Sequence, residues 1–138
     1  MHCCCCVIYD DAEGMDGNFI ETIEHHSGFG FDYATTVEDE EKSVKRYKGL
    51  ILKNGIENDY MYENDGVKFA YKAKVEDVDW KKTFESGDIC SFTNYSMFVD
   101  EFVFYNNKTQ KINYNEFHKL VKRLLNRSEM VQIADIHV

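Results

Sequence analysis

Apolar and polar residues alternate with a period of two along much of the chain, and this pattern predicts β-strands. The clearest run covers residues 67–75, with apolar residues on one face and three lysines and Ala70 on the other. The preceding Asn64-Asp65-Gly66 predicts a tight hairpin, because Asp-Gly tolerates the positive φ angles of a type I′ turn. Further strands are predicted at residues 3–9, 31–34, 50–52, 59–62, 89–95, 98–105 and 130–138.

Three other segments have the capping residues and the apolar spacing of amphipathic helices. The predicted helices cover residues 18–26, 36–48 and 115–126, and a helix of one or two turns is predicted at 79–85. The second is the best specified, because acids fill its first turn and Lys or Arg fill its last. We therefore expect one α+β domain over residues 1–138, in which a mainly antiparallel sheet carries residues 50–105 and three helices pack on its apolar face.

Four of the five cysteines are contiguous, from Cys3 to Cys6. Neighbouring side chains on a strand point to opposite faces, so this run does not suit a disulfide framework. No basic segment precedes the apolar start and no apolar run is long enough to span a bilayer, so we expect an intracellular, reducing, cytoplasmic location. The cysteines are expected to be free thiols in the core; a zinc site with His2 and acylation are the alternatives.

Charge divides the chain into two parts. The first 41 residues contain eleven acids and no Lys or Arg, so residues 42–138 hold 14 acids and all 16 basic residues, a balance of about +2. A field of one sign attracts basic partners and repels nucleic acid and anionic membranes. With a net charge of -9, direct binding of nucleic acid through the lysines of residues 67–75 is not expected.

The acidic residues do not form a recognisable metal motif. Counted from Asp10, the loop lacks the alternating oxygen ligands of a calcium-binding EF-hand, since Ala12 takes the third position. We therefore expect no metal and no cofactor.

Residues 28–47 combine glycines, an aromatic strand and a helix, and the run Asp100-Glu101-Phe102-Val103-Phe104-Tyr105 is a late acidic-aromatic strand. Together they resemble the ADP-ribosyltransferase family. The resemblance implies that Glu101 stabilises the oxocarbenium-like ribose. The family's first strand brings His-Gly or Arg to the nicotinamide ribose, whereas here that strand ends Tyr9-Asp10-Asp11. A divergent enzyme that uses Glu101 is therefore the alternative interpretation.

The main expectation is a non-enzymatic, acidic interaction or inhibitor protein that binds a basic surface of a partner protein, as a charge mimic of nucleic acid. The absence of Pro and the abundance of Asn, Tyr, Lys and Asp are typical of AT-rich coding, as in viruses, phages and mobile elements. The predicted contact residues are Asp10, Asp11, Glu13, Asp16, Glu38, Asp39, Glu40 and Glu41.

Overall fold

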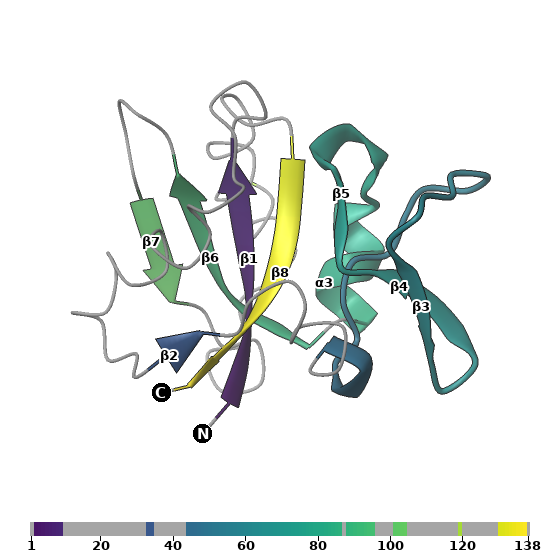
Figure 1. The fold of residues 1–138 in the computed structure, drawn as a ribbon. Coiled ribbons are helices and arrows are strands. Elements are labelled where there is room, and N and C mark those ends of the chain that lie inside the picture. Colours follow the sequence, from purple (N-terminus) through teal and green to yellow (C-terminus); the bar gives the residue numbers. More distant parts are fainter. Residues whose placement is uncertain are drawn as a thin grey trace.

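The structure is a computed structural model of the 138-residue chain, and it describes residues 2–9, 33–34, 44–86, 88–95, 101–104, 119 and 130–137. Within these residues, six strands form one sheet in the order β2-β8-β1-β6-β7, with β5 also paired to β8 (Figure 1). These strands are β1 (His2–Tyr9), β2 (Tyr33–Ala34), β5 (Lys72–Lys74), β6 (Ile89–Tyr95), β7 (Glu101–Phe104) and β8 (Met130–His137).

Strand β1 lies in the centre of this sheet, between β8 and β6. It pairs with β8 in antiparallel fashion along its whole length, from His2 opposite His137 to Tyr9 opposite Met130. It pairs with β6 in parallel fashion, while β6 and β7 are antiparallel. The two ends of the chain therefore lie together at one end of the sheet (Figure 1).

A separate two-stranded sheet is built from β3 (Met61–Asn64) and β4 (Val67–Ala70) and projects beside the main sheet (Figure 1). Its turn has φ of 54° at Asp65 and 77° at Gly66. Two successive positive φ angles define the type I′ turn that the Asp-Gly sequence predicted, so the hairpin prediction is confirmed.

The predicted continuous strand over residues 67–75 is wrong, because it divides at Tyr71 into β4 and β5. The Tyr71 amide donates to the Tyr60 carbonyl at 3.1 Å, and the Ile133 amide donates to the Tyr71 carbonyl at 2.9 Å. The chain thus passes at this residue from the small hairpin to the main sheet. Ala70, which the alternation placed on the lysine face, is fully buried, whereas Val67 is 49% exposed.

The prediction of three helices packed on one face of a sheet is also wrong. In the part of the chain that the structure describes, the helices with defined bounds are α3 (Trp80–Ser86) and the 3₁₀ turns η3 (Val44–Arg46) and η4 (Val75–Asp77). Of the predicted helix 36–48, residues 36–43 lie outside the described residues and residues 44–46 form a 3₁₀ turn. Residues 18–26 lie outside the described residues, as does 115–126 apart from Lys119, whose backbone is helical. The short helix predicted at 79–85 corresponds to α3 and is confirmed.

Several strand predictions hold with shifted ends. The predicted strands at 3–9, 89–95 and 130–138 correspond to β1, β6 and β8, and those at 31–34, 59–62 and 98–105 partly overlap β2, β3 and β7. Residues 50–52 form isolated bridges instead of a strand, in which Leu50 pairs with Ala70 and Leu52 with Val78.

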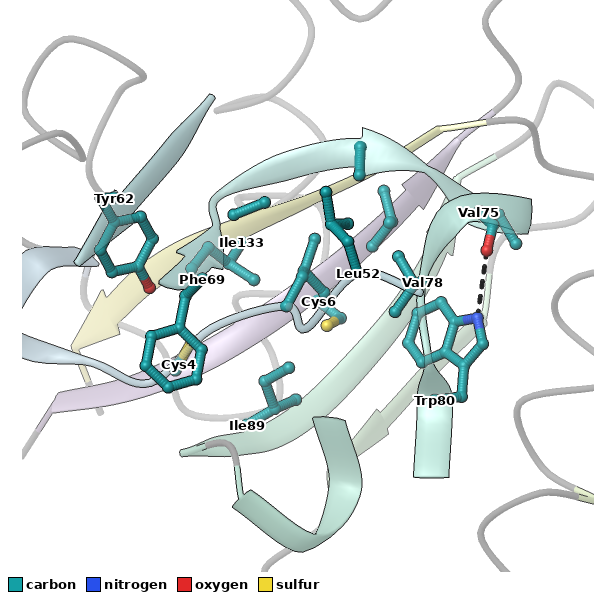
Figure 2. Packing of buried hydrophobic residues seen from close by; sticks show 14 residues of the cluster. Cys4, Cys6, Leu52, Tyr62, Phe69, Val75, Val78, Trp80, Ile89 and Ile133 are labelled. Carbon is teal, nitrogen blue, oxygen red and sulfur yellow. Dashed lines mark hydrogen bonds between the residues drawn. The ribbon is translucent and has the colours of Figure 1, made fainter. Parts of the chain in front are cut away.

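The core lies between β1 and β8 of the main sheet and the segment that runs from Leu50 to Trp80, and Ile89 of β6 packs into it (Figure 2). Cys4 and Cys6 of β1 and Ile133 of β8 face this segment, and Phe69 and Leu50 are among its largest fully buried side chains. Trp80 packs against the same cluster and its indole N–H donates to the Val75 carbonyl at 3.3 Å (Figure 2). This cluster removes apolar surface of α3, of the β3–β4 hairpin and of the main sheet from water.

Candidate functional site

The eight acids predicted to contact a partner lie outside the described residues. Elements that the structure does describe flank them in the sequence. Asp10 and Asp11 directly follow Tyr9, the last residue of β1, and Glu38–Glu41 fall between β2 and η3. The assignment of these acids to a contact surface stays a prediction.

Glu101, the residue of the enzyme alternative, is the first residue of β7 and pairs with Asn94 of β6. Its backbone thus lies in β7, at one end of the strand order of the main sheet. Among the described residues, no group of three or more His, Cys, Asp or Glu side chains could hold a metal ion. The role of Glu101 stays a prediction, which the loss of NAD turnover in a Glu101→Gln variant would test.

The cysteine run forms part of the core. Cys4, Cys5 and Cys6 are free thiols, and each is at most 1% exposed. Burial raises the pKa of the Cys6 thiol well above its ordinary value of 9.0, and the neighbouring Cys4 and Cys5 raise it further. Since the thiolate is the nucleophile and the metal ligand, a thiol shifted in this direction is inert. The expectation of free core thiols is confirmed for these three residues.

A buried polar cluster lies where η3 meets the main sheet. The Tyr47 hydroxyl donates to Asp135 Oδ1 at 3.1 Å, and the Tyr62 hydroxyl donates to the Tyr47 carbonyl at 2.8 Å. Asp135 is 3% exposed and lies opposite Cys4 across the β1–β8 ladder. Burial raises the pKa of both tyrosines, with nearby Asp135 adding to the effect on Tyr47 and Cys4 to that on Tyr62. Both hydroxyls therefore act as hydrogen-bond donors at neutral pH and not as bases.

A groove of about 450 Å³ lies beside the β3–β4 hairpin. Its lining mixes two carboxylates, an amide, a thioether, a phenol and an ammonium group, contributed by Glu57, Asn58, Met61, Tyr62, Glu63 and Lys68. Lys68 Nζ lies 3.8 Å from Glu57 Oε1, with both side chains more than half exposed. An exposed pair of this kind contributes at most about 1 kcal/mol, so water or a ligand can replace it.

The lysines of the predicted basic face do not form one surface. Lys72 Nζ lies 5.2 Å from the centre of the Tyr60 ring, and this ring meets Tyr71 edge-on at 5.5 Å between centroids. Lys68 is on the other side of the break at Tyr71, beside Glu57. Each of these two lysines therefore already has an intramolecular contact, because the chain changes sheets between them.

Sequence reasoning missed the acidic character of the hairpin. Residues 54–67 contain four acids and no Lys or Arg, and all four are exposed or partly exposed: Glu57, Asp59, Glu63 and Asp65. The signal was present in the charge pattern, but the larger imbalance of the first 41 residues obscured it. Two of these acids, Glu57 and Glu63, line the groove.

The chain matches no protein-family model, no curated protein and no solved structure. Among the described residues, no helix combines the length and the apolar character needed to cross a membrane.

Proposed function

We propose that this protein is a small acidic interaction protein that binds a basic surface on a partner protein and inhibits it by charge mimicry of nucleic acid. The observation that carries the proposal is the segregation of charge, with eleven acids and no basic residue in the first 41 positions. Clustered carboxylates reproduce the field of a phosphate backbone and increase the rate of association with a basic partner. The partner itself, and not nucleic acid, membrane or a cofactor, is the ligand.

The contact residues are the two acidic groups of the first 41 positions, Asp10, Asp11, Glu13 and Asp16, and Glu38, Asp39, Glu40 and Glu41. The described acids of residues 54–67 support the proposal, because they extend the negative charge to a second part of the chain. Three free buried thiols support a reducing cytoplasmic location, and the residue bias supports a viral, phage or mobile-element origin.

The test is an affinity pull-down from host lysate, washed at about 0.1 M and then about 0.5 M salt, where exposed charges are far more strongly screened. We expect retention of a nucleic-acid-binding protein that is released at the higher salt. A Glu40→Gln/Glu41→Gln variant should retain less of it. The matched control is Glu76→Gln/Glu85→Gln, which removes the same charge at exposed positions outside the acidic groups.

Full neutralisation of both acidic groups completes the test. Loss of the partner supports the proposal. Unchanged retention, or a partner that resists the high-salt wash equally well in every variant, would contradict it.

A further inference from the structure

The outer edge of β3 has main-chain groups directed away from its partner strand. In a two-residue hairpin the residues that flank the turn, here Asn64 and Val67, form a hydrogen-bonded pair, and such pairs alternate along the ladder. Tyr62 opposite Phe69 is the next bonded pair. The N–H and C=O groups of Met61 and Glu63 therefore point away from β4.

Hydrogen bonds on either side confirm this alternation. Ala70, which lies opposite Met61, exchanges both of its main-chain hydrogen bonds with Leu50 on the far edge of β4, at 2.8 and 3.0 Å. The next pair, Tyr60 and Tyr71, is again bonded at 3.1 Å. Among the residues that the structure describes, β3 has no strand neighbour other than β4.

The groove lies over the face of the hairpin that carries Met61, Glu63 and Lys68. Met61 and Glu63, whose main-chain groups face outward, both line it, together with Glu57 and Asn58. Met61 and Glu63 thus supply both the outward main-chain groups and part of the groove lining. An extended peptide that paired with Met61 and Glu63 would place alternate side chains over the groove, because the side chains of a strand alternate between its faces.

The charge near β3 favours a basic peptide over a second copy of this chain as the partner of its outer edge. Residues 54–67, which include β3, contain four exposed acids, and β3 itself contains neither Lys nor Pro, the residues that commonly protect a strand edge. Two copies of this edge would bring like charges together, which opposes pairing between copies. Basic side chains at every second position of a peptide would instead lie near Glu63 and Glu57, and at Glu57 they would replace the exposed contact with Lys68.

We propose that the outer edge of β3 is a docking site for an extended basic segment of a partner protein, which adds to the hairpin as a third strand. The basic nature of this segment rests on the proposed function, whereas the strand addition rests on the geometry of the edge.

The test uses a fluorescein-labelled synthetic peptide of alternating lysine and valine, titrated into the full chain by fluorescence anisotropy. In the control peptide every backbone amide is N-methylated, so this peptide keeps the charge but has no main-chain N–H group to donate to β3. We expect the lysine-valine peptide to bind and to shift the ¹⁵N amide resonances of Met61, Tyr62 and Glu63. Equal binding of both peptides, or shifts confined to residues 10–41, would overturn the proposal.

Two substitutions at one position separate charge from pairing. Glu63→Gln removes the carboxylate and keeps the outward N–H, whereas Glu63→Pro removes both and leaves the ladder to β4 intact, since this N–H is not part of it. We expect Glu63→Pro to bind about tenfold more weakly than Glu63→Gln, as for the loss of one main-chain hydrogen bond. Equal affinity of the two variants would contradict strand addition.

Lys68→Pro is the matched control, because it places proline at the paired position on the opposite edge of the hairpin. Because the Lys68 side chain lines the groove, this variant is compared with Lys68→Gln. The two should bind equally, and a loss from Gln to Pro as large as that at position 63 would contradict a site at the β3 edge. A dimer in sedimentation that Glu63→Pro dissociates would assign the edge to a second copy and overturn the proposal. Peptide binding fails or succeeds independently of the lysate experiment, so the two proposals are separately testable.

Discussion

The Tyr47 hydroxyl donates a hydrogen bond to the buried carboxylate of Asp135 across 88 positions of sequence, with 3.1 Å between Tyr47 Oη and Asp135 Oδ1. Asp135 lies in β8 and Tyr47 follows η3 directly. The bond therefore attaches the segment that leads into the hairpin to the central strands. A carboxylate buried to 3% exposure needs such donors, because an unpaired buried charge is strongly destabilising.

Removal of this donor should destabilise the protein. We expect Tyr47→Phe to lower the free energy of unfolding by about 1.5–3 kcal/mol, the usual value of a hydrogen bond to a charged group. Urea denaturation at neutral pH measures the change. Tyr60→Phe is the control, because within the described residues the Tyr60 hydroxyl makes no hydrogen bond. An equal effect of both substitutions would show that the bond to Asp135 contributes nothing specific.

Because the pKa of the Cys6 thiol is raised, the stability of the protein should change with pH in the alkaline range. Above pH 9 the thiol ionises in the unfolded chain but stays protonated in the folded one, so the folded state binds more protons and loses stability as pH rises. We expect a contribution of about 1.4 kcal/mol per pH unit from this group. Cys6→Ala should lower stability at pH 7 and flatten the decline above pH 9. An unchanged slope in urea titrations would show that Cys6 does not remain protonated.

Gly49 has no room for a side chain. A Cβ at this position would lie 2.6 Å from Tyr62 Oη, 2.8 Å from Ile133 Cδ1 and 3.0 Å from the Ala70 carbonyl oxygen. We expect Gly49→Ala to cost about 1–3 kcal/mol through overpacking, measured by thermal or urea unfolding.

Gly55 provides the comparison for that measurement. It has a φ of +80°, and a Cβ added there would meet no heavy atom within 4 Å, so Gly55→Ala meets backbone strain alone, at about 1–2 kcal/mol. The two mechanisms differ in their response to Tyr62→Phe, which removes the nearest atom and should relieve only the Gly49 variant. Equal effects of Tyr62→Phe in both backgrounds would contradict the close contact.

Two residues of β4 with the same predicted environment should respond very differently to truncation. Phe69 is 1% exposed in the core, whereas Val67 is 49% exposed. We expect Phe69→Ala to cost about 3–5 kcal/mol and Val67→Ala less than about 1 kcal/mol. Comparable losses in urea unfolding would show that both side chains pack in one face, as the alternation of residues 67–75 had indicated.

Local features were the ones that the sequence predicted well. The Asp65-Gly66 turn depends on the φ angles of two adjacent residues, and the short helix α3 depends on neighbours such as Asp79, whose carboxylate accepts from the Lys82 amide at 3.0 Å. The residue patterns at β1, β6 and β8 likewise indicated strands, and at β1 a buried one. The candidate contact acids were chosen from charge alone and lie outside the described residues, whereas the acids of residues 54–67 have a described setting.

Tertiary structure decided how these local pieces combine. Periodicity could not place the break at Tyr71, because this break depends on a bond to Ile133, which is 62 positions away. Nor could it indicate that Ala70 is buried by Leu50, or that β1 pairs in parallel with β6. The sequence by itself determined turns, strand-forming runs and the segregation of charge, since these depend on adjacent residues. Strand partners, the buried Asp135 and the outward edge of β3 were decided only in three dimensions, because they depend on which distant segments meet.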